Sequence, residues 1–158
     1  MTKGIVSGVV SNMVTLRVDG PVLQGEICYI TTGGDRLMAE VIKVVGSDVY
    51  VQVFESTRGL KVGSEAEFTG HQLEIQLGPG MLSKNYDGLQ NDLDKMDGVF
   101  LRRGQYTAPL DEDRLWDFEP IVKAGDRVQG SDWLGKVEEN HQPLKIMAPF
   151  QMEGTAVV

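Results

Sequence analysis

Few side chains of this sequence have the types and spacing that catalysis or metal binding requires. His71 and His141 are the two histidines, and neither has a cysteine or another histidine at the spacing of a zinc site. The sequence also lacks the phosphate-binding signature G-x-x-x-x-G-K-[ST], a G-x-G-x-x-G run before a helix and the nucleophile signature G-x-S-x-G. We therefore assign no catalytic, cofactor-binding or metal-binding residue.

A group of carboxylates is the remaining candidate for metal chemistry. Asp87, Asp92, Asp94 and Asp97 follow one another closely. A calcium loop of the EF-hand type needs a glycine at its sixth position and a glutamate at its twelfth, and this run has neither arrangement. We interpret these aspartates as the solvated face of a short helix, where those near its start would suit its positive end.

Composition narrows the class of protein and of partner. The chain has 158 residues, of which 41% are apolar and 24% charged, which is typical of globular proteins. Its net charge of −8 argues against nucleic acid and against an anionic membrane surface as partners. Cys28 is the only cysteine and lies in an apolar run, so we expect a buried structural thiol. The N-terminal residues do not form a signal peptide pattern, and we expect a cytosolic protein.

The first of three expected segments is a β-barrel domain over residues 1 to 70. Short apolar runs with alternating polar residues are separated by glycine-rich turns about every ten residues, a pattern typical of strands. In the longest run, residues 36 to 45, the side chains of Leu37, Ala39 and Val41 share one face. We expect six strands that close into a small barrel, because closure removes exposed sheet edges.

A turn-rich connector is expected over residues 71 to 109. Apolar residues at Leu89, Leu93 and Met96 predict a short helix over residues 89 to 96. The glycines and proline before this helix favour turns. The connector motif consists of Leu77, Gly78, Pro79, Gly80, Tyr86, Asp87 and Gly88.

A second β-rich block is expected over residues 110 to 158. Trp116 and Phe118 are two residues apart, and we expect them to anchor a core. Trp133, Leu134 and Val137 are further expected core residues. The chain ends at residues 157 to 158 in an apolar, strand-like run, so we expect this block to be truncated and to continue in a longer protein.

A loop after the fifth expected strand is the one candidate contact surface. It consists of Glu55, Ser56, Thr57, Arg58 and Gly59. One interpretation is a polar, solvated loop with a glycine turn. The other is an exposed arginine loop that contacts a neighbouring subunit.

Several motifs together resemble a known family. VFESTRGLKVG, then EFTG, LGPGMLSKNYDGLQ, GVFLRRG and KIMAPF with a later GT occur in order along the chain. They are similar to the N-terminal third of the catalytic A subunit (alpha chain) of bacterial V-type and archaeal-type rotary ATPases. The motif LGPG-x-L with the following YDG-[IL]-Q is the specific one, because related subunits of such ATPases share the ESTRGL loop.

The resemblance implies a role within a larger machine. Residues 1 to 70 would form a crown with the barrels of neighbouring A and B subunits, and residues 110 to 158 would begin the bulge (non-homologous) domain. A contact of that domain with a peripheral stalk is left open. The full-length subunit would use ATP and magnesium to hydrolyse or synthesise ATP, coupled to proton or sodium movement. Its nucleotide site would lie beyond residue 158, on the cytoplasmic side and without direct membrane contact.

Two other classes of protein remain as alternatives. The second block also looks like a biotinyl or lipoyl carrier domain, but residues 138 to 142 lack the lysine that carries the group, and Lys145 lies too near the next strand. A stand-alone β-rich adaptor is the third interpretation. The sequence also departs from the resembled family after Gln90, where Asn91 and Asp92 replace a segment with a proline, and we expect the helix to extend there.

Overall fold

The computed structural model describes residues 2–96 and 103–158 of the chain, which divide into two compact units. The barrel unit consists of Met1–Ile75 with Met96–Thr107, and the second unit consists of Gln76–Lys95 with Ala108–Val158. In the described ranges, no helix is long and apolar enough to cross a membrane. The expected brief strand at residues 99 to 101 and the carboxylate of Asp97 lie outside the described residues.

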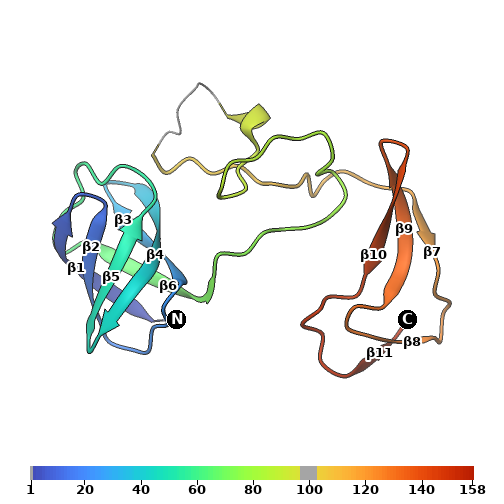
Figure 1. Cartoon of the computed structure of the whole chain (residues 1–158), viewed down its shortest axis with the longest axis horizontal. Coiled ribbons are helices and arrows are strands. Elements are labelled where there is room, and N and C mark those ends of the chain that lie inside the picture. Colours follow the sequence, from blue (N-terminus) through green and yellow to red (C-terminus); the bar gives the residue numbers. More distant parts are fainter. Residues whose placement is uncertain (1, 97–102) are drawn as a thin grey trace. The chain divides into compact units, whose positions relative to one another are not determined.

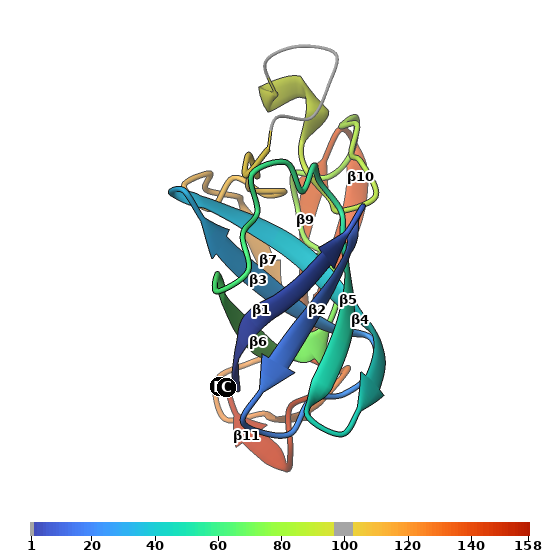
Figure 2. The ribbon, with the colours of Figure 1, turned by 90° about the vertical axis from the view of Figure 1, so that its left-hand side faces the viewer.

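Six antiparallel strands make the barrel unit a closed barrel, in the order β1-β2-β5-β4-β3-β6 (Figures 1 and 2). Because β1 also pairs with β6, neither strand forms an open edge there. The strands are β1 (Lys3–Val10), β2 (Met13–Val18), β3 (Glu26–Thr32), β4 (Asp35–Val45), β5 (Asp48–Val53) and β6 (Glu65–Gln72). The expected six-stranded barrel is thereby confirmed.

The interior of the barrel is filled by the side chains that alternate along its strands. On β4, Leu37, Ala39 and Val41 are buried, as the alternation predicted. Phe68 on β6 is the largest fully buried side chain and is 1% exposed. Cys28 is fully buried as well, and its burial raises the pKa of the thiol to about 12, so it stays protonated and inert at neutral pH.

Two antiparallel sheets form the regular part of the second unit. A three-stranded sheet has the order β10-β9-β7, and a two-stranded sheet pairs β11 with β8 (Figure 1). Asn140 and His141, with φ of 50° and 61°, make the two-residue turn between β9 and β10. The strands are β7 (Phe118–Pro120), β8 (Arg127–Gln129), β9 (Trp133–Glu139), β10 (Gln142–Met147) and β11 (Thr155–Val157).

The expected core of this second unit is largely wrong. Val137 is buried, but Trp133 and Phe118 are 44% and 48% exposed. Phe118 lies across the strand pair on Gly135, whose missing side chain leaves space for the ring: a Cβ there would lie 2.3 Å from the ring. Trp116 precedes β7 rather than lying within it, so the two aromatics do not share a strand face.

The helix expected over residues 89 to 96 is also wrong in length and type. Only a single turn of 3-10 helix, η1 (Leu93–Lys95), is present. Before it, the carboxylate of Asp87 accepts hydrogen bonds from the backbone N–H groups of Leu89 and Asn91. Gln90 between them has a φ of 61°. This local side-chain capping replaces the first helical turn, a competition that is usual for aspartate.

Candidate functional site

The contact loop, residues 55 to 59, connects the end of β5 to the turn before β6 in the barrel unit. Glu55 and Thr57 are half-buried, whereas Ser56, Arg58 and Gly59 are exposed. Gly59 has a φ of 78°, a conformation that favours glycine. Leu60 then packs against the barrel core. The loop is therefore anchored at both ends and exposed in its middle.

The carboxylate of Glu55 is the centre of a hydrogen-bonded cluster. Its Oε1 accepts hydrogen bonds from the hydroxyl of Tyr106 at 2.5 Å and from the N–H of Gly104 at 3.3 Å. Its Oε2 accepts one from the backbone N–H of Met38 on β4, at 3.1 Å. The same N–H lies 2.9 Å from the Tyr106 oxygen. The returning segment 103–106 and the contact loop are thus bound to each other and to the barrel wall.

Tyr106 is held in place by aromatic and charged neighbours as well. Its ring lies edge-on to that of Tyr29, with 6.5 Å between centroids, and the guanidinium of Arg36 lies 4.0 Å from the Tyr29 ring. Burial raises the pKa of Tyr106 well above its usual value, and the hydrogen bond to Glu55 raises it further. The hydroxyl therefore remains a donor to Glu55 over the physiological pH range.

Arg103 completes this arrangement. Its Nη1 donates to the backbone oxygen of Arg58, and its Nε lies 3.3 Å from a carboxylate oxygen of Asp35. Nothing in the sequence around Arg103 indicated that its side chain would bind Arg58 and Asp35. The partner loops are far apart in the sequence, and only the barrel brings them together.

The glycines of the connector motif make close contacts within the second unit. A Cβ added at Gly78 would lie 3.1 Å from the side chain of Leu110, and Gly80 has a φ of 103°. Tyr86 is half-buried and donates its hydroxyl to the backbone oxygen of Pro109. Leu77, before the first glycine, is 72% exposed. Residues 76 to 95 thus fold back on the second unit rather than extending as a free linker.

Asp92 is the residue whose position sequence reasoning missed most clearly. We expected it on a solvated helix face, but its side chain is fully buried. It accepts a hydrogen bond from Lys84 Nζ at 2.6 Å, and Lys95 Nζ lies 3.8 Å away. The hydrogen bond from Lys84 lowers the pKa of Asp92 despite its burial, and the same bond raises the pKa of Lys84.

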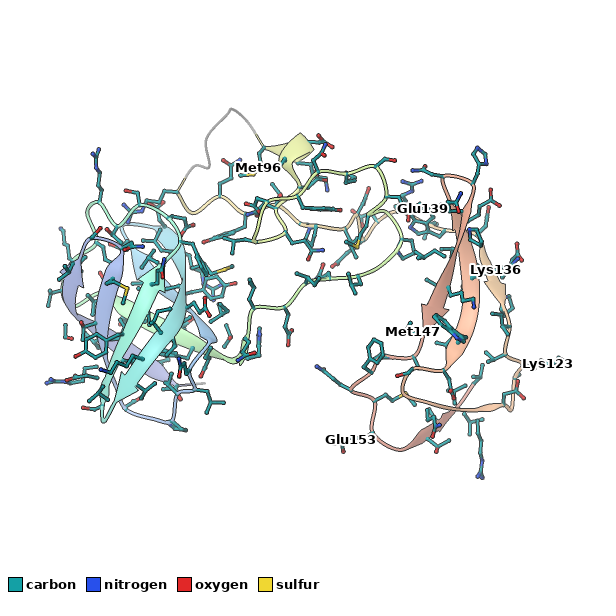
Figure 3. All side chains as sticks on the ribbon, viewed as in Figure 1. Met96, Lys123, Lys136, Glu139, Met147 and Glu153 are labelled. Carbon is teal, nitrogen blue, oxygen red and sulfur yellow. The ribbon has the colours of Figure 1, made fainter. Side chains whose placement is uncertain are left out.

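Glu139 at the end of β9 fastens the connector to the three-stranded sheet. It is 4% exposed, and its Oε1 accepts a hydrogen bond from the N–H of Leu82 at 2.9 Å. Next to it, Asn140 donates to the hydroxyl of Ser83. Figure 3 labels Glu139 and Lys136 on β9, and Lys136 forms an ion pair with Glu119 on β7 at 2.8 Å. Polar contacts therefore hold this unit together.

The hairpin that ends in Asn140 and His141 bears on the carrier-domain alternative. Its tip has no lysine. Lys145 lies on β10 instead, where its Nζ is 4.8 Å from the centroid of the Trp133 ring. The tip of the hairpin therefore presents no amine for a covalent prosthetic group.

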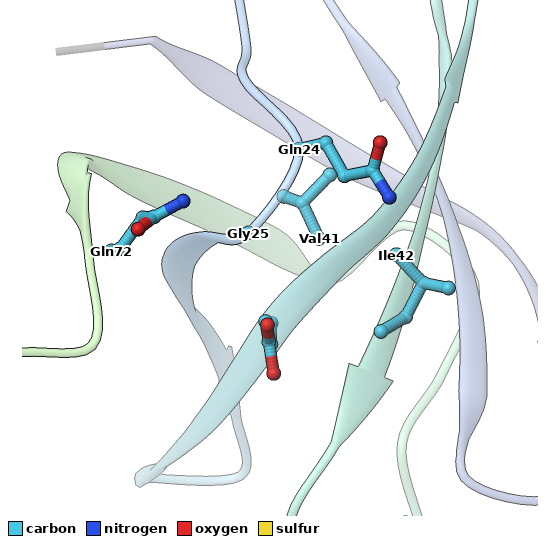
Figure 4. A pocket seen from close by; sticks show the side chains of 6 residues that line it. Gln24, Gly25, Val41, Ile42 and Gln72 are labelled. Atoms are coloured by element: carbon cyan, nitrogen blue, oxygen red, sulfur yellow. The ribbon is translucent and has the colours of Figure 1, made fainter.

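A shallow groove lies on the surface of the barrel unit (Figure 4). Its volume is about 390 Å³, and its lining includes the amides of Gln24 and Gln72, the carboxylate of Glu40 and the side chain of Ile42. The residues that line it include no basic side chain, which a phosphate group would need. In the part of the chain that the structure describes, no group of three metal-ligating side chains is present either.

Comparison with protein families gives two matches, one for each structural unit. Residues 6–70 match the beta-barrel domain of the ATP synthase alpha/beta family. Residues 107–158 match the barrel-sandwich domain of the ATP synthase alpha/beta subunit. The first match covers most of the closed barrel, and the second covers all five strands of the second unit.

Curated relatives extend this similarity along nearly the whole chain. A V-type ATP synthase alpha chain of Borreliella afzelii (strain PKo) is 47% identical over 152 residues, which is 94% of this chain and 26% of the relative. Alpha chains of Borreliella burgdorferi (strain ZS7) and Borrelia hermsii (strain HS1 / DAH) are 46% and 47% identical, with the same coverage. The chain thus spans about a quarter of the length of the relatives it matches.

Proposed function

We propose a structural role in assembly for this chain, from the premise that it belongs to the ATP synthase alpha/beta family as a relative of V-type ATP synthase alpha chains. The chain corresponds to the barrel and barrel-sandwich portion of such an alpha chain. In this role it does not carry out the chemistry of ATP. It joins its subunit to the neighbouring subunits of a rotary ATPase.

The closed barrel is the observation that carries this proposal. It is a closed barrel with a filled interior, and the residues that line the groove of Figure 4 include no basic side chain. A rigid body without a reactive cluster suits a role in holding subunits together. The 47% identity over 94% of the chain makes the alpha chain the relevant comparison.

The partners in this proposal are the neighbouring A and B subunits of the ATPase head. Their barrels would meet this one through the contact loop, residues 55 to 59, whose middle is exposed while its ends are fastened. The second unit would be free to meet a peripheral stalk. The complex would lie on the cytoplasmic side of the membrane, and this chain would bind neither the bilayer nor nucleic acid.

The nucleotide chemistry in this proposal belongs to the full-length subunit. ATP and magnesium would bind in a part of the protein that follows the barrel-sandwich portion, because residues 1 to 158 lack a phosphate-binding signature. There, ATP hydrolysis or synthesis would be coupled to movement of protons or sodium ions. This chain by itself would bind no nucleotide.

The proposal is tested by removing the barrel from the full-length protein. The gene is first read beyond codon 158, where we expect an open reading frame with a G-x-x-x-x-G-K-[ST] motif. The full-length chain is then expressed with its B subunit, with and without residues 3 to 72. Native mass spectrometry should show an alternating ring for the intact chain only, and a ring of normal yield without the barrel would reject the assembly role.

A further inference from the structure

Hydrogen bonds of both side chains and backbone hold the contact loop at several positions. The hydroxyl of Thr57 donates to the backbone oxygen of Ser11 at 2.6 Å, and the N–H of Leu60 donates to the oxygen of Thr57 at 3.0 Å. The backbone oxygen of Arg58 is bound by Arg103. Glu55 closes the other end through its bonds to Tyr106 and Met38. The loop is therefore tied to the rest of the barrel unit at Glu55, Thr57 and Arg58 before any partner binds.

Arg58 differs from the other arginines described in the barrel unit. Arg17 lies 3.4 Å from a carboxylate oxygen of Asp48, Arg36 lies 3.9 Å from one of Glu67, and Arg103 lies 3.3 Å from one of Asp35. Among the residues that the structure describes, the guanidinium of Arg58 has no carboxylate partner, and the residue is exposed. This holds within the barrel unit although carboxylates are in excess in the chain, whose net charge is −8.

We propose that Arg58 anchors the contact between this barrel and its neighbour by forming an ion pair with a carboxylate on the neighbouring protein. This inference rests on the proposed function, because it assigns the chemistry of the partner at the contact loop. A guanidinium binds a carboxylate through two parallel N–H···O bonds, which fix the orientation of the two surfaces. Since the loop backbone is already ordered, binding loses little conformational freedom beyond that of the arginine side chain.

A protein carboxylate fits this position better than a phosphate group does. A phosphate site needs several converging donors, but the loop N–H groups of Arg58 and Leu60 already face oxygen atoms of the loop itself. The net negative charge of the chain also disfavours a polyanion such as ATP more than a single carboxylate. Lys61, which follows the loop and is exposed, adds a second positive charge toward an acidic surface.

The first experiment tests whether the contact loop meets a neighbouring subunit at all, independently of the ion pair of Arg58. A photo-crosslinking amino acid is placed at Lys61 of the full-length chain, which is then assembled with its B subunit. Cross-links from this position to a neighbouring subunit are expected. If none form, the contact loop does not meet a neighbour, and both this inference and the contact part of the proposed function fail.

The second experiment tests the ion pair in the same assembled complex. Arg58→Glu should raise the dissociation constant of the neighbouring subunit by at least about 30-fold, whereas Arg58→Lys should retain part of the affinity. Lys43→Glu is the matched control, because it makes the same charge change at an exposed position of β4 and should leave the affinity within about twofold. Suppose that the cross-links form normally but the Arg58→Glu variant binds with unchanged affinity. The contact would then stand, and the ion pair would be rejected.

A charge exchange identifies the partner group. The acidic residue nearest the cross-link is changed to arginine, and this change should restore assembly of the Arg58→Glu variant. Titration of the unassembled chain with ATP tests the competing source of an oxyanion. Saturable binding of ATP that is lost on Arg58→Ala would overturn the assignment of a protein carboxylate.

Discussion

The two units of this chain are stabilised in different ways. The barrel unit closes around a continuous cluster of buried apolar side chains. In the described part of the second unit, only Val128, Val137 and Ala148 are buried apolar residues, and the buried polar residues are at least as numerous: Gln90, Asn91, Asp92 and Glu139. The barrel therefore owes its stability to apolar burial, which tolerates changes of pH and salt. The second unit depends on hydrogen bonds and an ion pair, which respond to both.

The largest expected effect comes from the barrel core. Phe68→Ala should lower the free energy of unfolding of the barrel by about 3–5 kcal/mol, because it removes a fully buried aromatic side chain and leaves a cavity. Urea denaturation followed by circular dichroism measures the change. Phe54→Ala, at a residue that is 38% exposed, is the control and should cost much less. Equal losses for both variants would contradict the view that one central cluster stabilises the barrel.

A smaller effect is expected where two strands of the second unit approach closely. A Cβ at Gly135 would lie 2.5 Å from the backbone oxygen of Glu119, so Gly135→Ala should cost about 1–3 kcal/mol through displacement of β7. Hydrogen exchange should show faster exchange in β7 and β9 and an unchanged barrel. Gly8→Ala is the control, because its nearest neighbour would be at 3.8 Å. If the amides of the barrel also exchanged faster in the Gly135→Ala variant, the two units would not unfold separately.

The ion pair should make the second unit sensitive to pH where the barrel is not. The pKa of Asp92 is lowered in the folded state, so its contribution is present above about pH 4. It is lost as the pH falls through the lowered value. The pKa of Lys84 is raised, so its contribution is lost only as the pH rises above about 10.5. Thermal unfolding at a series of pH values measures both limits.

Asp92→Asn is the matching variant for this pH dependence. It should flatten the acid limb of the unfolding profile of the second unit, and it should change stability less than Gly135→Ala because water and salt screen Lys84. Asp113→Asn is the control, because Asp113 is exposed and is not among the groups that shift the pKa of Lys84. The same acid limb in wild type and Asp92→Asn would show that another carboxylate is responsible.

The smallest expected effect concerns the cluster that holds the contact loop. Tyr106→Phe removes the hydrogen bond to Glu55 and the weaker, shared one from the Met38 N–H, and should cost the barrel about 1 kcal/mol. Hydrogen exchange of residues 55 to 59 should nevertheless increase, because the returning segment then binds the loop less firmly. Tyr50→Phe, on β5, is the control. Unchanged exchange of the loop would mean that Tyr106 does not order it.

The barrel could be predicted from the sequence because the alternation of interior and exterior residues can be read along each strand separately. Alternation along β4 identified Leu37, Ala39 and Val41 as interior residues, and glycines identified the turns. The second unit lacks such a pattern. The burial of Asp92 depends on Lys84, and the exposure of Phe118 depends on a glycine of another strand. Neither relation is periodic, so residue types and spacing alone did not indicate them.

The same distinction explains the outcome for the candidate site. Exposure of Arg58 could be expected from a polar loop, but its ordering by Tyr106 and Arg103 could not. These residues lie more than forty positions away, on a segment that the sequence described only as a connector. The helix expected from Leu89, Leu93 and Met96 was wrong, because spacing alone does not reveal that Asp87 competes for the backbone N–H groups.

The closure of the barrel by its first and last strands has a consequence for the newly made chain. Lys3 pairs with Glu67, so β1 has no complete set of neighbours until β6 has been synthesised. At about 5–20 residues per second, the ribosome needs several seconds for the residues in between. During that time the open side of β1 is exposed. We therefore expect nascent chains that stall before residue 72 to be bound by chaperones, and those that stall well after it to be released.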